Sequence, residues 1–331
     1  MSLLSDPFQR QINYLRLSVT DHCNYHCHYC RDSEHLTQTT KNEILSYEEI
    51  IRIVQIFAEL GVTKVRLTGG EPLLRKNLVK LISQLKKIPG INDLPLSTNA
   101  HLLTSLAQQL KTAGINRINI SIDSLKNDRF RQITRGGELD KVISGIDTAI
   151  NIGLKPIKLN MVVMHGINDD EIENLIDFAI NRKIDIRFIE TMPIGSSGID
   201  SSTQHYSEAD IFDRIQNHLP NQLIKVVADK TSGPAKNYKI QNTDSSVGII
   251  SAVSNHFCES CNRLRLTAKG RLILCLGQEN SISLRDAIRS NKSNQEIKLM
   301  ITEVLKFKPK RHEFDSNINN IDQVQMVEIG G

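Results

Sequence analysis

The six cysteines of this chain fall into two groups of three, with none left over. Cys23, Cys27 and Cys30 form a C-x3-C-x2-C group near the start of the chain. The C-x2-C-x13-C group near the end consists of Cys258, Cys261 and Cys275. Three thiolates hold three of the four irons of a [4Fe–4S] cluster, which leaves the fourth iron open to a substrate or cofactor. The spacing therefore predicts an iron–sulfur enzyme with two such clusters.

Disulfides and zinc are the alternative uses of these cysteines. Residues 1–20 lack the basic and apolar regions of a secretory signal peptide, so we expect a cytoplasmic chain whose thiols stay reduced. Zinc remains an alternative from the spacing alone, because histidines flank both groups, at His22, His26, His28 and His256. A structural zinc site, however, usually closes with four ligands.

Composition is consistent with a packed globular protein and disfavours two classes of partner. The chain has 331 residues, of which 39% are hydrophobic and 24% charged, and its formal net charge is +4. This mild charge fits a local pocket for an acidic small molecule better than a nucleic-acid surface, and the chain has no Trp. No apolar run approaches the roughly 18 residues of a membrane-spanning helix. We therefore expect neither nucleic acid nor a membrane as a partner.

Strand-like and helix-like segments alternate over the first two thirds of the chain. The expected strands are Leu15–Val19, Lys64–Thr68, Pro95–Ser97, Arg117–Ile122, Pro156–Val163 and Asp185–Ile189. The expected helices include Tyr47–Leu60, Arg75–Lys87, Thr104–Ala113, Asp140–Ile152 and Asp169–Arg182. Such repetition predicts a parallel sheet with outer helices. Polar and glycine residues gather just after the strands, as on the catalytic face of a barrel. The expected fold is therefore α/β, a partial (βα)6 TIM-type barrel.

The pattern changes after Glu190. The composition of residues 195–204 predicts a flexible loop, and that of residues 231–237 a linker or turn. Short strands are expected at Tyr238–Ile240, Gly248–Ile250, Leu264–Thr267 and Arg271–Cys275, then helices at Leu284–Ser290 and Asn294–Phe307. We therefore expect two domains: the partial barrel over residues 1–230, and a smaller C-terminal α+β domain over residues 231–331. The second domain would carry the second cluster and end in a flexible Gly-Gly tail.

The run Gly69–Gly70–Glu71–Pro72 follows the second expected strand. Its glycines let the backbone approach a ligand closely, although such a run is a weak signal by itself. Combined with the first cysteine group at the end of the neighbouring strand, it resembles the radical S-adenosylmethionine (SAM) superfamily. The resemblance implies that the open iron of the first cluster binds SAM. One-electron cleavage of SAM would then give a 5′-deoxyadenosyl radical.

Further stretches narrow the resemblance: FCESCNRLRLTAKGRLILCL, LRLSVTDHC, VRLTGGEPLLR and the terminal Gly-Gly. They are similar to the GTP 3′,8-cyclases, radical SAM lyases of the first step of molybdenum cofactor (molybdopterin) biosynthesis. The resemblance implies that the radical abstracts hydrogen from C3′ of GTP and that C3′ then attacks C8. The product would be (8S)-3′,8-cyclo-7,8-dihydroguanosine 5′-triphosphate, with cyclic pyranopterin monophosphate synthase acting downstream. An electron donor is also implied.

The resemblance further implies roles for individual residues. The first cysteine group holds the SAM cluster and the second group holds a cluster whose open iron binds GTP. The residues at SAM-contacting positions are Tyr29, Gly70, Ser121 and Met192. The residues at GTP-contacting positions are Arg16, Arg66, Ser97, Lys158, Arg263, Leu264 and Arg265. A further basic residue near the substrate is Arg187, and the tail residues needed for catalysis are Gly330 and Gly331.

The expected cations make independent physical sense. Four of them lie on candidate barrel strands: Arg16, Arg66, Lys158 and Arg187. A triphosphate inside a cavity needs several converging cations, and buried cations without an anionic partner are costly. The alternative is a set of internal salt bridges with Asp123 or Glu190.

Two features depart from the family, and the function has alternatives. Arg31–Asp32 follow the first cysteine group where related sequences often have Met-Pro, and residues 308–327 include an atypically polar tail. One alternative is another radical SAM enzyme with an auxiliary C-terminal cluster, such as a peptide-modifying maturase, which would need a peptide groove. Another is a non-enzymatic zinc-binding module. The identity of the electron donor stays open, as does the oligomeric state, a homodimer included.

We expect Cys261→Ser to spare SAM binding and abolish GTP turnover, because the second group is assigned to GTP. Equilibrium SAM binding and product formation on the reconstituted protein measure the two effects. Equal loss of both would contradict the division of labour between the two groups.

Overall fold

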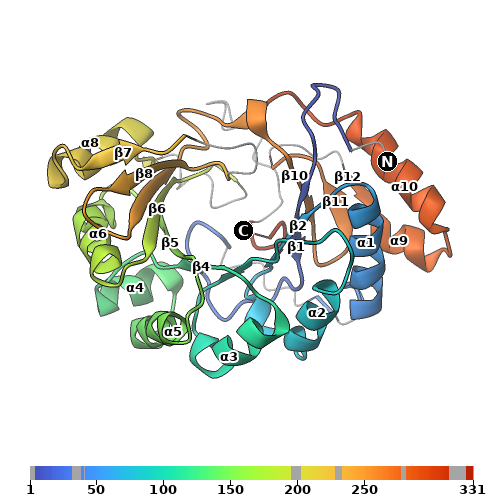
Figure 1. Ribbon diagram of the computed structural model, residues 1–331, viewed down its shortest axis with the longest axis horizontal. Helices are drawn as coiled ribbons and strands as arrows, with labels where there is room; N and C mark the ends of the chain where they lie inside the picture. The colour runs from blue at the N-terminus through green and yellow to red at the C-terminus, as the bar shows by residue number, and fades with distance from the viewer. Residues whose placement is uncertain are drawn as a thin grey trace.

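The strands of this protein form one continuous sheet, seen in a computed structural model that describes residues 4–31, 39–40, 42–194, 203–227, 233–276, 281–312 and 326–330. Among these residues the sheet has twelve strands, in the order β12-β11-β10-β1-β2-β3-β4-β5-β6-β9-β8-β7. Figure 1 shows the strands curving around the middle of the molecule, with the helices on the outside. The expected parallel sheet with outer helices is confirmed.

Six parallel strands form the first part of the sheet. They are β1 (Tyr14–Ser18), β2 (Lys64–Thr68), β3 (Leu96–Thr98), β4 (Ile118–Ser121), β5 (Ile157–Val163) and β6 (Asp185–Glu190). The outer helices are α1 (Tyr47–Glu59), α2 (Leu78–Leu85), α3 (Leu103–Ala113), α4 (Asn127–Thr134), α5 (Leu139–Asn151), α6 (Ile172–Asn181) and α8 (Glu208–His218). Each expected strand and helix of this part is present, with ends that differ by up to three residues.

The C-terminal part joins the same sheet at both edges. Strand β9 (Ser246–Ile250) pairs in parallel with β6, and β10 (Arg263–Leu266) pairs in parallel with β1. Antiparallel strands then extend the sheet on either side: β7 (Leu223–Lys225), β8 (Lys236–Ile240), β11 (Arg271–Ile273) and β12 (Ser281–Ser283). The last helices are α9 (Leu284–Arg289) and α10 (Asn294–Leu305). The expected domain boundary at residue 230 lies outside the described residues and stays a prediction.

Local signals explain where several helices begin. Ser46 caps α1 in a capping box with Glu49, as its sequence predicts. Helix α8 begins with the same device at Ser207, but with Asp210 in the place of the usual glutamate. We did not expect α8, nor α4, which is only eight residues long and largely polar. Each helix buries only two or three residues, at Phe130, Ile133 and Thr134 in α4 and at Ile211 and Ile215 in α8, which makes the apolar pattern short.

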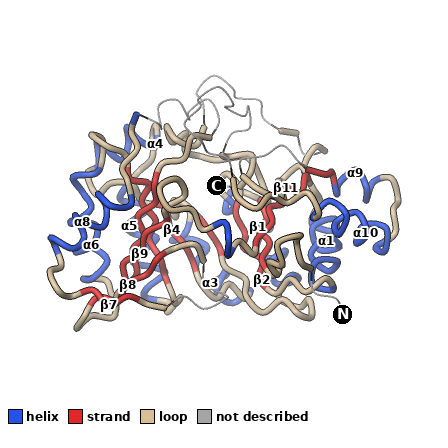
Figure 2. The backbone as a smooth tube through the Cα atoms, turned by 90° about the horizontal axis from the view of Figure 1, so that it is seen from above, coloured by secondary structure: helices blue, strands red, loops and turns tan. Residues whose placement is uncertain are grey.

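Side chains of the parallel strands alternate between the helix layer and the inside of the barrel. Leu15 and Leu17 on β1 are fully buried against the helices, while Tyr14 and Arg16 lie on the other face. Figure 2 shows the same wall of strands from above, with the C-terminus near the middle. In the described part of the chain no helix is long and apolar enough to cross a membrane.

A buried arginine ties the N-terminal loop to the C-terminal part. Arg10, only 8% exposed, forms an ion pair with Asp6. Its Nη1 donates to the carbonyl oxygens of Cys258 at 2.8 Å and Lys310 at 2.9 Å, and its Nη2 donates to Pro309 at 2.5 Å. One guanidinium therefore holds three chain segments that lie far apart in the sequence.

We expect Arg10→Met to lower the free energy of unfolding by about 3 kcal/mol, because it leaves the buried Asp6 carboxylate unpaired. Chemical denaturation measures the effect. Lys292→Ala is the matched control, since its ion pair with Glu296 is exposed and is worth less than about 0.5 kcal/mol. A loss no larger than that of the control would contradict the assigned role of Arg10.

Candidate active site

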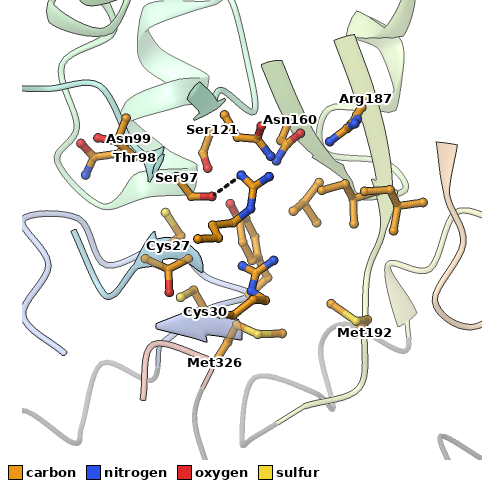
Figure 3. A pocket seen from close by; sticks show the side chains of 18 of the residues that line it. Cys27, Cys30, Ser97, Thr98, Asn99, Ser121, Asn160, Arg187, Met192 and Met326 are labelled. Atoms are coloured by element: carbon orange, nitrogen blue, oxygen red, sulfur yellow. Dashed lines mark hydrogen bonds between the residues drawn. The ribbon is translucent and has the colours of Figure 1, made fainter. Parts of the chain in front are cut away.

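A cavity of about 500 Å³ lies inside the barrel. Ligand pockets of roughly 300–1,000 Å³ are typical for small molecules. Thiols of the first cysteine group line the cavity together with basic side chains from several strands. Figure 3 shows Cys27 and Cys30 on the same cavity as Arg187, Asn160 and Met192. The sheet thus brings together residues that span most of the sequence.

The loop after β1 carries the first cysteine group and is held by backbone contacts. Gly70 N donates to Thr20 O at 2.7 Å, and Glu71 N donates to His22 O at 2.8 Å. A Cβ atom on Gly70 would lie 2.3 Å from His22 O, which is closer than real contacts allow. Glycine is therefore required at position 70 so that β2 can end directly against the cysteine loop.

Hydrogen bonds to Glu71 stabilise this arrangement. Its buried carboxylate accepts hydrogen bonds from Thr98 Oγ1 at 2.7 Å, Asn99 N at 2.7 Å and Leu73 N at 2.9 Å. Burial raises the pKa of Glu71 to about 7, although these hydrogen bonds oppose the shift. Asn99 continues the network, because its side chain donates to Asn24 Oδ1 at 2.9 Å. The Gly-Gly-Glu run thus positions the cysteine loop.

The thiols of the first group suit an iron–sulfur cluster. Burial raises the pKa of Cys23 to about 11 and of Cys30 to about 12, and it raises the pKa of Cys27 as well. Iron supplies the positive charge that would stabilise these groups as thiolates. Among the described residues no three Cys, His, Asp or Glu side chains gather as they would around a single metal ion. A cube instead distributes three thiolates over three irons, and three thiols on one loop beside Gly70 match that demand.

Basic side chains converge on the cavity from strands β10, β1, β2, β5 and β6. Arg16 lies in register with Arg66 on one side and with Arg265 on the other. Burial lowers the pKa of Arg16 to about 10, and repulsion from neighbouring arginines adds to the shift. Burial likewise lowers the pKa of Arg187 to about 10. This concentration of buried positive charge calls for a polyanion in the cavity.

Internal salt bridges account for only part of this charge. Lys158 Nζ pairs with Asp185 at 2.6 Å, so the salt-bridge alternative holds for Lys158, though with a different carboxylate from those we considered. Asp123 accepts instead from Tyr29 Oη at 2.7 Å and Val162 N at 2.9 Å. Glu190 accepts from the backbone nitrogens of residues 208, 253 and 254. Both expected carboxylate partners are therefore committed elsewhere.

The four residues expected at SAM-contacting positions all line the cavity: Tyr29, Gly70, Ser121 and Met192. The expected GTP-contacting residues also line it, with one exception. That exception is Leu264, which is 1% exposed and packs in the core while its neighbours Arg263 and Arg265 face the cavity. Any contact of Leu264 with a ligand would have to come from its backbone.

The second cysteine group lies behind the cavity wall. Cys261 N donates to Cys258 O at 3.1 Å, and Cys258 is 6% exposed. Its three cysteines do not line the cavity, whereas the adjacent residues Phe257, Arg263 and Leu276 do. Burial would raise the pKa of Cys261, but the charges of Lys308 and Arg263 outweigh it and lower that pKa. The expected second cluster, whose open iron would bind GTP, stays a prediction.

The described part of the C-terminal tail reaches the barrel cavity, where Met326 and Val327 are lining residues. Gly330 O accepts from Arg16 Nη2 at 3.1 Å and from Arg265 Nη1 at 3.4 Å. Met326 and Ile329 pack with Ile194 in a small apolar cluster. Gly331 and Asp32 lie outside the described residues, as do residues 313–325.

Comparison with known proteins decides the family. The chain is 50% identical to the GTP 3′,8-cyclase of Hydrogenovibrio crunogenus over 99% of both chains. It is 42% identical to that of Alkaliphilus metalliredigens over 99% of this chain and all of the relative. This chain belongs to the GTP 3′,8-cyclase family. The family models agree: "Radical SAM superfamily" matches residues 17–179, and "Molybdenum Cofactor Synthesis C" matches residues 184–314. The resemblance stated from sequence is confirmed.

Solved structures show how widely the fold of this cyclase family member is shared. The crystal structure of Streptococcus suis SuiB bound to precursor peptide SuiA superposes with a TM-score of 0.64, covering 93% of this chain and 76% of that chain. Methylornithine synthase (PylB) gives a TM-score of 0.51, covering 65% and 64%. Identities are 15% and 16%, so the likeness shows the radical SAM fold alone.

Sequence reasoning missed several residues that line the cavity of this cyclase family member. The clearest is Tyr14, whose phenolic oxygen accepts from Arg66 Nε at 2.7 Å. Alternation along β1 was a usable signal, because Tyr14 and Arg16 share a strand face. The others that we did not single out include Lys64, Arg117 and Asn160. Their roles depend on contacts across strands, which the sequence does not display.

We expect Tyr14 to ionise near neutral pH. Burial opposes ionisation, but the charges of Arg66, Arg16 and Lys64 outweigh it and lower the pKa of Tyr14 to about 7. The pKa of Tyr14 is lower in the folded chain than in the unfolded chain. Ionised Tyr14 therefore contributes fully to the free energy of unfolding above about pH 10, and this contribution is lost as the pH falls through about 7. Ultraviolet difference spectra should show one of the six tyrosines titrating near pH 7.

Tyr14→Phe should abolish that early titration, and Tyr47→Phe is the matched control, since burial raises the pKa of Tyr47. Inorganic triphosphate should move the early titration upward, because an anion offsets the nearby arginines. An unchanged spectrum in Tyr14→Phe would contradict the assignment.

Proposed function

We propose that this chain converts GTP to (8S)-3′,8-cyclo-7,8-dihydroguanosine 5′-triphosphate, the first step of molybdenum cofactor biosynthesis. The observation that carries the proposal is the shared cavity, in which the thiols Cys23, Cys27 and Cys30 lie on the same space as the converging arginines. Membership of the GTP 3′,8-cyclase family supports the substrate. The chemistry that a [4Fe–4S] cluster and SAM supply when bound is a 5′-deoxyadenosyl radical.

The chain's own residues bind and orient the substrate. The triphosphate would be held by the basic side chains on β1, β2 and β10, namely Arg16, Arg66, Arg263 and Arg265. Lys158 and Arg187 would contribute from β5 and β6. These cations are already in place, so the substrate meets a preorganised site. Holding one ribose carbon towards the thiol end of the cavity selects the hydrogen at C3′.

The SAM side of the cavity would be formed by the first cysteine loop and the strand ends. At Gly70 the protein backbone could approach the cofactor closely, because glycine has no side chain. Ser121 and Met192 line the same space. Tyr29 is fixed by its hydrogen bond to Asp123, so its ring is held in one orientation. The second cysteine group would hold a second [4Fe–4S] cluster next to the guanine end. The tail glycines would approach the substrate from the phosphate side.

The remaining assignments of place and partner are also proposals. We place the enzyme in the cytoplasm, where thiols stay reduced. It needs an electron donor, and its product is consumed by cyclic pyranopterin monophosphate synthase. Neither nucleic acid nor a membrane is proposed as a partner.

Anaerobic turnover tests the proposed function. The protein is reconstituted with iron and sulfide, then supplied with dithionite, SAM and GTP, and the products are identified by mass spectrometry. We expect 5′-deoxyadenosine together with an isomer of GTP, which has the same mass as GTP but a different ultraviolet spectrum. Formation of 5′-deoxyadenosine without GTP consumption would support radical SAM chemistry but contradict GTP as the substrate. A peptide-modifying maturase would be the next candidate.

We expect Arg66→Leu to weaken GTP binding about 30-fold, since a charge-assisted hydrogen bond is worth about 2 kcal/mol. SAM binding should be unchanged, because Arg66 contacts Tyr14 and Ser97 rather than the cysteine loop. Isothermal titration with each ligand measures the two effects. Arg52→Leu on the outer helix α1 is the control. Equal weakening of SAM and GTP would indicate a collapsed barrel and contradict the assigned role.

A further inference from the structure

The segment after α10 buries a lysine behind the second cysteine group. Lys308 is only 3% exposed. Its Nζ donates to Arg263 O at 3.1 Å and to Leu274 O at 2.5 Å. Leu274 directly precedes Cys275, and Arg263 lies two residues after Cys261. One ammonium group therefore joins the two segments that carry these cysteines.

Arg10 is a second buried cation beside the same cysteine group, and its charge is compensated in a different way from that of Lys308. Arg10 donates to Cys258 O, but its charge is paired with the carboxylate of Asp6. For Lys308, the described residues provide carbonyl oxygens and no carboxylate partner. The two carbonyls accept hydrogen bonds from Lys308 but leave its unit charge uncompensated. A buried ammonium in that condition is unfavourable to fold.

The missing negative charge is available in the second cysteine group itself. Cysteines bound to iron are thiolates, and the charge of three thiolates exceeds that of the cationic iron–sulfur core, so the loaded site keeps a net negative charge next to Lys308. Net charge and hydrogen bonding around an iron–sulfur cluster set its reduction potential. A fixed positive charge favours the reduced form, because one-electron reduction by an external donor adds one negative charge and breaks no bond.

We propose that Lys308 is a positioning residue of the second cluster, which orients its two cysteine segments and raises its reduction potential. The inference rests on the proposed function, since it requires that the second cysteine group hold a [4Fe–4S] cluster.

A potentiometric titration of the second cluster tests the inference. The full-length chain is used with Cys23, Cys27 and Cys30 replaced by alanine, so that only the second cluster reports. Dithionite reduction is followed by electron paramagnetic resonance in this parent and in parent variants carrying Lys308→Met, Lys308→Arg or Lys306→Met. Lys306 is the matched control because its ammonium is exposed and pairs with Glu303.

In Lys308→Met we expect the ratio of reduced to oxidised cluster at a fixed potential to fall about tenfold, which is about 59 mV for a one-electron couple. Lys308→Arg should restore most of the parental potential because it keeps the charge, and Lys306→Met should match the parent. A parental midpoint in Lys308→Met with iron retained would overturn the inference.

Denaturation of the iron-free chain separates charge compensation from simple cross-linking. Compensation predicts that Lys308→Met leaves the iron-free chain as stable as its parent, or more stable, while the loaded chain releases iron faster. Equal destabilisation with and without iron would overturn the inference. The parent itself should bind about four irons. Absence of that iron would refute the second cluster in the proposed function, whereas an unchanged potential with the iron present would refute only the role of Lys308.

Discussion

The confinement of several positive charges inside the barrel is the constraint on which both the stability and the ligand binding of this molecule depend. Arg16, Arg66 and Arg265 lie at one level of three adjacent strands, so pairing of the strands places their guanidinium groups side by side. Repulsion in a medium of low dielectric constant would oppose folding if nothing offset it. Tyr14 Oη and the carbonyl oxygen of Gly330 supply part of the compensation. The rest has to come from an anionic ligand, which makes the barrel a binding site.

A second constraint joins this charged cavity to the thiols of the first cysteine group. The strand end at Gly70 fits against the loop that carries the thiols, and Glu71 anchors the neighbouring strand end through Thr98 and Asn99. The distance between thiols and arginines is therefore set by rigid strands instead of flexible loops. A radical formed at one end of the cavity can then reach only what the other end holds in place.

The same fold serves different substrates in different proteins, so fold alone does not assign the chemistry. SuiB, which binds a precursor peptide, shares the fold at 15% identity. The chemistry depends on the side chains that line the cavity, and in this chain several arginines lie among them. The surroundings of the two cysteine groups also differ. Burial dominates around the first group, whereas cations dominate around Cys261 in the second.

The sequence by itself determined the two cysteine groups through their spacing, the parallel barrel through its alternating segments and the family through the resemblance of several motifs, because all three depend on order along the chain. The position of Arg16 and Arg66 on candidate barrel strands also indicated an anionic ligand, because buried cations without a partner are costly. Only the tertiary structure decided that Lys158 pairs with Asp185, that Leu264 packs in the core, and that β9 and β10 flank the six parallel strands on opposite sides. Strand order and register are not written in local sequence, since they follow from which apolar faces can be buried together.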